Sequence, residues 1–308
     1  MIICVTPNVA VDRTYLLPGL QPGQVHRATR TIVVAGGKGL NVARAVQTLG
    51  EATLVMGLVG GRSGELVAEL AAQEGLPARW TWVAGETRNC AILVSEDGTP
   101  ATVINDRGAQ VSTTEWLQFV HDVAEAAQEA SAVCICGSLP PGAPAHAPSD
   151  LVEAVLAAGV PVWVDASGPA LAQAVNAYPT GLKINDEEAA VLLGRALPFL
   201  DDVHRAAQAV QARGVDHVII TLGARGAIYC AGRRQLHLRA PNLAAVSATG
   251  SGDAFLAGWL VAQGHGLDAA AALAWGIAAG AANALSPSGG HFARADFDRF
   301  LAQLIDET

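Results

Sequence analysis

Two glycines and an aspartate, directly before an apolar stretch, are the strongest candidates for chemistry in the sequence. The segment reads Thr249-Gly250-Ser251-Gly252-Asp253. Glycines allow a tight backbone turn, and the free N–H groups at the start of the following helix can hold an anion such as a phosphoryl group. Asp253, in the first helical turn, is placed to accept a proton from an attacking hydroxyl. The alternative is that Asp253 only caps the helix, where aspartate is favoured.

A second glycine-rich segment, Gly36-Gly37-Lys38-Gly39-Leu40-Asn41, also leads into a predicted helix. Its glycines let a ligand approach the backbone, Lys38 adds a positive charge, and Asn41 can hydrogen-bond sugar hydroxyls. The segment does not have the G-x-x-x-x-G-K-[ST] spacing of a Walker A loop. A plain glycine-rich turn with a solvated lysine is the alternative.

A third candidate lies at a strand-to-helix junction, where Asn185 and Glu188 are three residues apart. Both side chains then face the same end of the helix and can hold hydrated Mg²⁺ beside ATP phosphates. The N-x-x-E pattern is also that of a capping box. The two roles can coexist.

Five such segments occur in the order and spacing of the ribokinase-like (PfkB) sugar kinases, which the chain resembles over essentially its whole length. They are Gly36–Ala43, Gly137-Ser138-Leu139-Pro140-Pro141-Gly142, Lys183–Glu188, Leu222–Gly226 and Thr249–Asp253. Within that family the G-G-K-G-x-N-V-A form, Thr87-Arg88-Asn89 and G-S-L-P-P-G resemble the 1-phosphofructokinase and tagatose-6-phosphate kinase branch. Two departures, Ile184 in the usual K-P-N and Ser251 in the usual G-A-G-D, remove no functional side chain.

The resemblance implies three groups of site residues. Asp253 would be the catalytic base, with an anion hole of Gly250, Ser251 and Gly252. The sugar phosphate would meet Asp12, Gly37, Lys38, Asn41 and Ser138, with Arg88 and Arg27 on its phosphate. ATP would meet Lys183, Asn185, Thr221, Gly223, Gly226 and Asn283, and Glu188 would act on Mg²⁺ through water.

The elements that must position these residues alternate between helices and apolar strands. Strands are predicted at Ile2–Thr6, Leu54–Leu58, 132–136, 161–165, 181–184 and 217–221, and a short antiparallel pair is predicted near 226–239. The alternation of helices and apolar strands after residue 113 favours a mostly parallel sheet covered on both faces. The predicted fold is therefore a three-layer α/β/α architecture. We expect a body formed by 1–11, 35–86 and 106–308, and a small β lid formed by 12–34 and 87–105. Within the lid, strands are expected at Thr14–Leu17, His26–Val34, Asn89–Ser95 and Ala101–Asn105.

Composition narrows the class of protein. The 308 residues are 51% hydrophobic, and the net charge of −9 includes no acidic block. The 19 Lys and Arg form no basic run, which argues against a nucleic-acid partner. Five cysteines without a CxxC favour reduced, buried thiols. The start of the chain does not resemble a signal peptide, and the Ala/Gly-rich stretch 269–285 favours a close-packed core helix over a membrane span. We expect a cytoplasmic protein.

Two other classes of protein fit the sequence less well. A Rossmann oxidoreductase would need G-x-G-x-x-G after the first strand, where the sequence has Thr6-Pro7-Asn8-Val9-Ala10. A non-catalytic sugar-phosphate-binding protein would be expected to lose Asp253 or a glycine before it. The expected reactants are ATP and a sugar phosphate, with fructose 1-phosphate ahead of tagatose 6-phosphate and fructose 6-phosphate. A homodimer through the lid is also expected.

Overall fold

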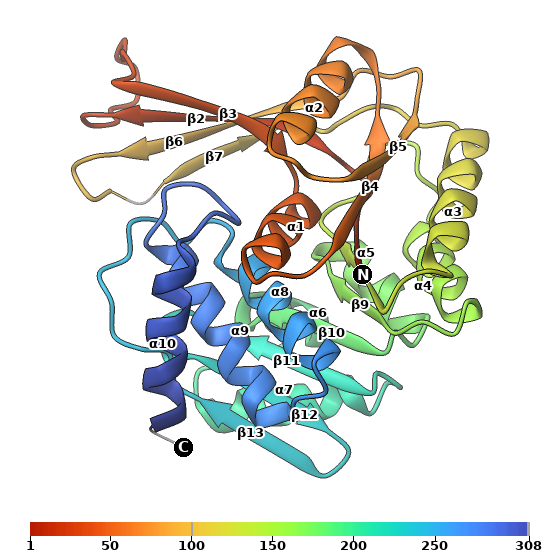
Figure 1. Ribbon diagram of the computed structural model, residues 1–308, viewed down its shortest axis with the longest axis vertical. Coiled ribbons are helices and arrows are strands. Elements are labelled where there is room, and N and C mark those ends of the chain that lie inside the picture. The colour runs from red at the N-terminus through yellow and green to blue at the C-terminus, as the bar shows by residue number, and fades with distance from the viewer. Residues whose placement is uncertain (100, 307–308) are drawn as a thin grey trace.

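A nine-stranded sheet forms the centre of the molecule in the computed structural model, which describes residues 1–99 and 101–306 (Figure 1). From edge to edge its strands are β13 (Arg234–Leu238), β12 (Ala227–Ala231), β11 (His217–Thr221), β10 (Gly181–Asn185), β9 (Val162–Asp165), β8 (Ala132–Cys136), β1 (Ile2–Thr6), β4 (Thr53–Val59) and β5 (Ala78–Trp82). Strands β11 to β5 are parallel, and β12 and β13 are antiparallel. The predicted fold class is confirmed. Strand β5 is an addition to the predicted strands.

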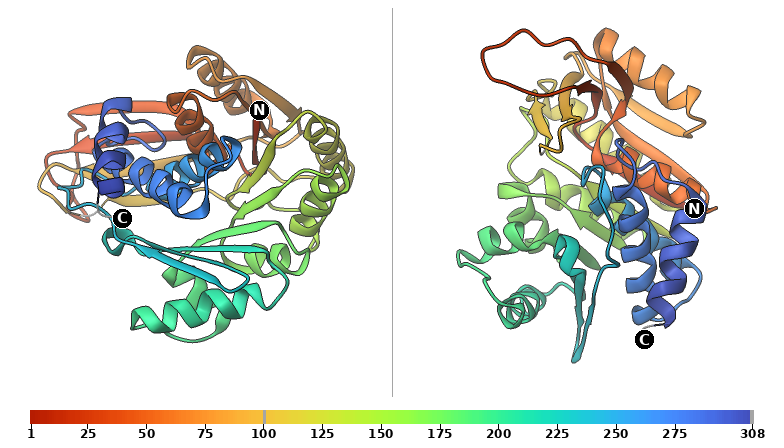
Figure 2. Two further views of the ribbon diagram at one scale, coloured as in Figure 1. Left: turned by 60° about the horizontal axis from the view of Figure 1, so that its bottom comes forward. Right: turned by 90° about the vertical axis from the view of Figure 1, so that its left-hand side faces the viewer.

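Helices cover both faces of this sheet, which explains why its strands are apolar throughout. In β1, Ile2 and Cys4 face one hydrophobic cluster while Ile3 and Val5 face the other. The first cluster contains α1 (Lys38–Thr48), α8 (Ser251–Gly264), α9 (Ala269–Ala284) and α10 (Arg294–Asp306). The second contains α3 (Thr113–Ala127), α4 (Ala147–Ala157), α5 (Gly168–Asn176), α6 (Asp186–Leu193) and α7 (Leu200–Gln211). Figure 2 shows the blue C-terminal helices and the green helices on opposite sides of the sheet.

The Ala/Gly-rich helices α8 and α9 pack closely, as expected for 269–285. A Cβ on Gly258 would lie 2.5 Å from the carbonyl oxygen of Trp275, so only glycine allows this approach. Among the described residues, no helix has the length and apolar character needed to cross a membrane. All five cysteines are buried and free.

A separate four-stranded sheet, here called the small sheet, contains β3 (Arg30–Gly36), β2 (Ala10–Leu17), β6 (Arg88–Ser95) and β7 (Thr102–Asn105), in that order. The antiparallel pairs β2–β3 and β6–β7 are joined by parallel pairing of β2 with β6. Helix α2 (Gly61–Gln73) contacts β2 and β3 on one side and β4 and β5 on the other. The strand expected from His26 begins only at Arg30, after a long loop whose last residue, Thr29, donates from its backbone N–H to the oxygen of Leu16. Position 100, in the expected lid, and positions 307–308, in the expected body, lie outside the described residues.

The small sheet faces the carboxyl edge of the large sheet across a cavity. Thr6, Asn185 and Thr221, which end β1, β10 and β11, line the same cavity as Asp12 and Cys90 of the small sheet. In open parallel sheets, ligands bind in the crevice beyond the carboxyl ends of the strands. The topology therefore predicts a ligand site in this cavity.

Candidate active site

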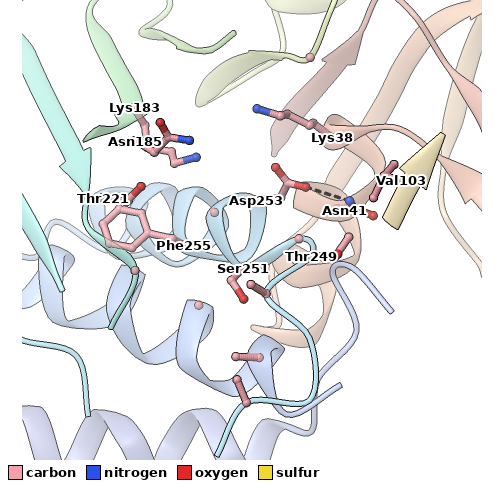
Figure 3. Close-up of a pocket in the computed structure, with 18 of the residues that line it drawn as sticks. Lys38, Asn41, Val103, Lys183, Asn185, Thr221, Thr249, Ser251, Asp253 and Phe255 are labelled. Carbon is pink, nitrogen blue, oxygen red and sulfur yellow. Dashed lines mark hydrogen bonds between the residues drawn. The ribbon is translucent and has the colours of Figure 1, made fainter. Parts of the chain in front are cut away.

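The cavity has a volume of about 890 Å³ and contains most of the predicted site residues. This lies in the range of small-molecule sites and suits two substrates of moderate size. Figure 3 shows Lys38 and Lys183 reaching into it from opposite sides, with Asp253 between them at the start of α8.

Asp253 stands in the first turn of α8, where Gly250 adopts a left-handed backbone with φ 79°. A Cβ on Gly250 would lie 2.4 Å from Cα of Gly289, so the turn requires glycine. Asp253 is 6% exposed, and its Oδ2 accepts a hydrogen bond from Nδ2 of Asn41 at 2.8 Å (Figure 3). This partner comes from α1 and not from the start of α8.

Burial raises the pKa of Asp253 to about 6, and the nearby charge of Asp165 adds to this effect. The ammonium groups of Lys38 and Lys183 and the hydrogen bond from Asn41 oppose it. A carboxylate with this pKa is mostly ionised at pH 7, yet remains basic enough to take up a proton. Asp253 therefore has the properties of a general base.

Asp165 is a central residue that sequence reasoning missed. It is fully buried, and it accepts hydrogen bonds from Nζ of Lys38 at 2.7 Å and from Nζ of Lys183 at 2.5 Å. Although burial favours its neutral form, the two lysines lower the pKa of Asp165 to about 2. The available signal was a carboxylate at the end of an apolar strand, Val162–Asp165, on the carboxyl edge of the sheet.

The two lysines are fixed beside Asp253. Burial opposes the charge on Lys38, but Asp165 and Asp253 outweigh it and raise the pKa of Lys38 above its usual value. A Cβ on Gly252 would lie 2.7 Å from Nζ of Lys183, so glycine allows this lysine to reach the start of α8. From the sequence, Lys38 was expected to contact the sugar phosphate. The ion pair with Asp165 holds the Lys38 ammonium near Asp253, at the centre of the cavity.

The small-sheet end of the cavity is lined by Asp12, Arg88 and Ser138. Burial raises the pKa of Asp12, while Arg88 and Arg44 counteract this effect. The guanidinium of Arg88 donates to the backbone oxygens of Asn8 at 2.8 Å and of Asp106 at 3.3 Å. These bonds hold Arg88 against the cavity wall.

Asn8 is a second residue that sequence reasoning missed. It is 5% exposed, lines the cavity and donates from Nδ2 to Oγ of Ser138 at 3.1 Å. A polar residue directly after the first strand was the signal. Arg27 is different: it is exposed in the loop between β2 and β3 and does not line the cavity. The structure therefore does not bring Arg27 to the other site residues.

The opposite end of the cavity is lined by residues at the ends of β10 and β11, namely Lys183, Asn185, Glu188, Thr221, Gly223 and Gly226. Asn185 and Glu188 form the capping box of α6: Glu188 N donates to Oδ1 of Asn185 at 2.7 Å, and Asn185 N donates to Oε2 of Glu188 at 2.9 Å. The capping interpretation therefore describes this structure. Because both side chains also line the cavity, the capping box is compatible with a second role in binding Mg²⁺.

Asn283 does not line the cavity, although it was expected to contact ATP. It is fully buried, donates from Nδ2 to the backbone oxygen of Thr249 at 2.9 Å, and accepts from the N–H of Gly290 at 2.7 Å. These bonds tie the loop before α8 to the loop after α9. In this structure Asn283 thus shapes the loop that carries Gly250.

A family model and several solved structures match the chain over nearly its whole length. The family model described as pfkB family carbohydrate kinase matches residues 3–295. Phosphofructokinase-2 from Escherichia coli, in its tetrameric inhibited form, is similar at 27% identity with a TM-score of 0.91, and 99% of each chain is covered. The structure of its complex with fructose-6-phosphate has 26% identity and a TM-score of 0.89, and again 99% of each chain is covered.

Two more distant structures share the fold. A possible 1-phosphofructokinase from Thermotoga maritima has 23% identity and a TM-score of 0.87, and 98% of this chain and 97% of that chain are covered. Arabidopsis thaliana ribokinase complexed with ribose and ATP has 22% identity and a TM-score of 0.78, and 97% of this chain and 98% of that chain are covered. The family match spans nearly the whole chain, and the chain belongs to the PfkB family of carbohydrate kinases.

Proposed function

We propose that the protein transfers the γ-phosphoryl group of ATP to a hydroxyl of a ketohexose phosphate, with fructose 1-phosphate as the first candidate acceptor. The observation that carries this proposal is Asp253, a buried carboxylate with a pKa of about 6 at the N-terminus of α8 and beside two lysines. Acceptor and nucleotide would lie on either side of it, toward Arg88 and toward Thr221 respectively.

The proposed reaction is an in-line displacement at phosphorus. The acceptor hydroxyl oxygen forms a bond to the γ-phosphorus while the bond to the oxygen bridging to the β-phosphorus breaks, and Asp253 takes the hydroxyl proton. Lys38, Lys183 and the N–H groups of 250–252 would stabilise the negative charge on the group in transfer. The small sheet would help exclude water, since Asp12, Cys90 and Val103 face the same cavity.

The residues present fit Mg²⁺ bound mainly by phosphates and water. Within residues 1–99 and 101–306, no cluster of three His, Cys, Asp or Glu side chains is arranged to hold a metal ion. Mg²⁺ commonly keeps several waters and binds through one or two carboxylates plus substrate phosphates. Glu188 supplies a carboxylate at the nucleotide end, and the bound ion would offset charge on the phosphates.

Glu188→Gln separates the metal role from the capping role. We expect the variant to need a higher Mg²⁺ concentration for half-maximal rate, because an amide binds Mg²⁺ more weakly than a carboxylate. Capping alone predicts a lower melting temperature with an unchanged Mg²⁺ dependence. Rates over a Mg²⁺ series and a thermal melt give both values, and an unmoved Mg²⁺ curve would rule out the metal role.

Fructose 6-phosphate is the second candidate acceptor. It is favoured by the similarity to E. coli phosphofructokinase-2, whose complex with fructose-6-phosphate has this fold at 26% identity. The motifs Gly36–Ala43 and Thr87-Arg88-Asn89 instead support fructose 1-phosphate or tagatose 6-phosphate. ADP release with each of these sugar phosphates, and with free fructose and ribose, decides among them by kcat/KM. Binding of a sugar phosphate without ADP release from any acceptor would indicate a non-catalytic binding protein.

We also propose that a second copy of the chain packs against the small sheet. All four residues of the edge strand β7 are exposed, including Ile104 at 58%. Exposed apolar edge strands favour pairing with another chain. The wild type should therefore sediment as a dimer or larger species and Ile104→Asp as a monomer. A monomeric wild type at micromolar concentration would contradict this arrangement.

A further inference from the structure

Helix α1 carries a charged residue on its buried face. Arg44 is 5% exposed, although its neighbours Ala43 and Ala45 belong to the hydrophobic core. A buried charge is costly unless it is paired and hydrogen-bonded. The partners of Arg44 therefore indicate why an arginine occupies this position.

Arg44 binds three groups at once. Its Nη2 donates to the backbone oxygen of Ala35 at 2.5 Å and to Oε1 of Glu74 at 2.9 Å, and its Nε also pairs with Glu74. Its Nη1 donates to Oδ1 of Asn41 at 3.0 Å. The pair with Glu74 joins α1 to the end of α2, which is a structural function. The hydrogen bond to Asn41 connects Arg44 to the cavity, because Asn41 lines it.

Asn41 links this arginine to Asp253. Its Oδ1 accepts from Arg44, and its Nδ2 donates to Oδ2 of Asp253 at 2.8 Å. A guanidinium can only donate hydrogen bonds, and an ionised carboxylate can only accept them. The amide satisfies both neighbours in this one orientation. A flipped amide would place oxygen against carboxylate and NH₂ against guanidinium.

Backbone packs closely against Asn41. A Cβ on Gly289 would lie 2.8 Å from Nδ2 of Asn41, and a Cβ on Gly290 would lie 2.4 Å from its backbone oxygen. The amide is therefore confined between this loop, Arg44 and Asp253. Confinement limits translation of the side chain, but it does not by itself decide which end of the amide faces the carboxylate.

We propose that Arg44 is a positioning residue that holds the Asn41 amide in the orientation that donates to Asp253, and so keeps this carboxylate ionised and fixed at the start of α8. The role of Asp253 as base rests on the proposed function. The orientation of the amide does not, and it can be tested without any substrate.

The test is a titration of the Asp253 carboxyl carbon by NMR in ligand-free protein labelled with ¹³C at aspartate, with the signal assigned by its loss in Asp253→Asn. Other charged groups face Asp253 from β9 (Asp165), β10 (Lys183) and α1 (Lys38), and all stay unchanged in the variants. Glu74, His291 and Asp12 lie close enough to Arg44 to interact with its charge.

Arg44→Lys and Arg44→Met should both raise the titration midpoint of Asp253 by about one pH unit, as expected for loss of a hydrogen bond to a charged group. The lysine keeps the charge but cannot bind Asn41, Glu74 and Ala35 together. A midpoint raised only in Arg44→Met would mean that charge alone acts. An unchanged midpoint in both folded variants would leave Arg44 a purely structural role. Either result overturns the proposal.

Two further variants keep the test decisive if the Arg44 variants do not fold. Asn41→Ala removes the link itself and should raise the midpoint as much. Where Arg44→Lys does fold, adding it to Asn41→Ala should cause no further shift. Glu74→Gln weakens the ion pair but leaves Arg44 beside Asn41, so it should lower the melting temperature without moving the midpoint. An unmoved midpoint in Asn41→Ala would also overturn the proposal. Because no turnover is needed, failure here is separate from failure of the kinase assay.

Discussion

Asp253→Asn is expected to lower kcat by about 10²–10⁴-fold, the range for loss of a positioned general base. The amide keeps the shape of the side chain and can still accept from Asn41, so ATP binding should change little. In the wild type, kcat/KM should fall as the pH drops below about 6, because protonation of Asp253 removes the base. Steady-state kinetics from pH 5 to 9 measure both effects.

Asp268 offers a matched control, because it is an aspartate that caps a helix. It precedes α9, and its Oδ1 accepts from the N–H groups of Ala270 and Ala271. Asp268→Ala should lower the melting temperature and leave kcat unchanged. If Asp253→Asn behaved in the same way, with near-native turnover, Asp253 would be a cap and the proposed mechanism would be wrong.

Asp253→Asn should also stabilise the folded protein above pH 6. The folded-state pKa of Asp253 is about 6 and its ordinary value is 3.8, so the folded state binds more protons between these values. Stability of the wild type therefore falls as the pH rises through this window. Asp253→Asn does not ionise and should be more stable by up to about 3 kcal/mol at pH 8. Urea unfolding at pH 4 and pH 8 measures the difference.

Arg88→Ala should lower kcat/KM for the sugar phosphate by about two orders of magnitude, since hydrogen bonds between charged groups contribute about 1.5–3 kcal/mol each. The guanidinium lines the cavity next to Ser138 and is held by the backbone oxygens of Asn8 and Asp106. Trace activity on free fructose should hardly change, because that substrate has no phosphate for Arg88 to bind. Measuring both substrates in wild type and variant gives the change in preference.

Two controls separate phosphate binding from support of the fold. Arg88→Lys keeps the charge without the two-pronged geometry and should recover only part of the loss. Arg13 lies on the same small sheet, next to Asp12 in β2, but does not line the cavity. Arg13→Ala should therefore leave kcat/KM unchanged. Equal losses on both substrates in Arg88→Ala would mean that Arg88 supports the small sheet rather than the phosphate.

Residues beside a glycine-rich turn that leads into a helix were predictable from the sequence, because such a turn lets a ligand approach the backbone. Asp253, Lys38 and Asn41 were found in this way. Asp165 was not, since its partner Lys38 lies 127 residues away and an aspartate that ends a strand resembles an ordinary strand terminus. Arg44 likewise interrupted an apolar helix face without any local sign of its partners.

The fold was predictable where the pattern is local and strong. The alternation of apolar strands and helices from residue 113 onward gave the parallel sheet. Strand β5, with its polar Arg79 and Thr81, did not show a continuous apolar run and was missed. The parallel pairing of β2 with β6 was also outside the reach of sequence reasoning, because it joins two hairpins through contacts that no local pattern encodes.

The ion pairs around Asp165 have a consequence for the electrical balance of the site. Lys38 and Lys183 together carry two positive charges, and Asp165 and ionised Asp253 carry two negative ones, so these four groups sum to zero. These four groups therefore present two ammonium groups at the centre of the site without a net positive charge. A polyphosphate that enters brings negative charge that these groups do not offset, and the dipole of α8 compensates only part of it. Such a site favours an anion that arrives already paired with its own cation.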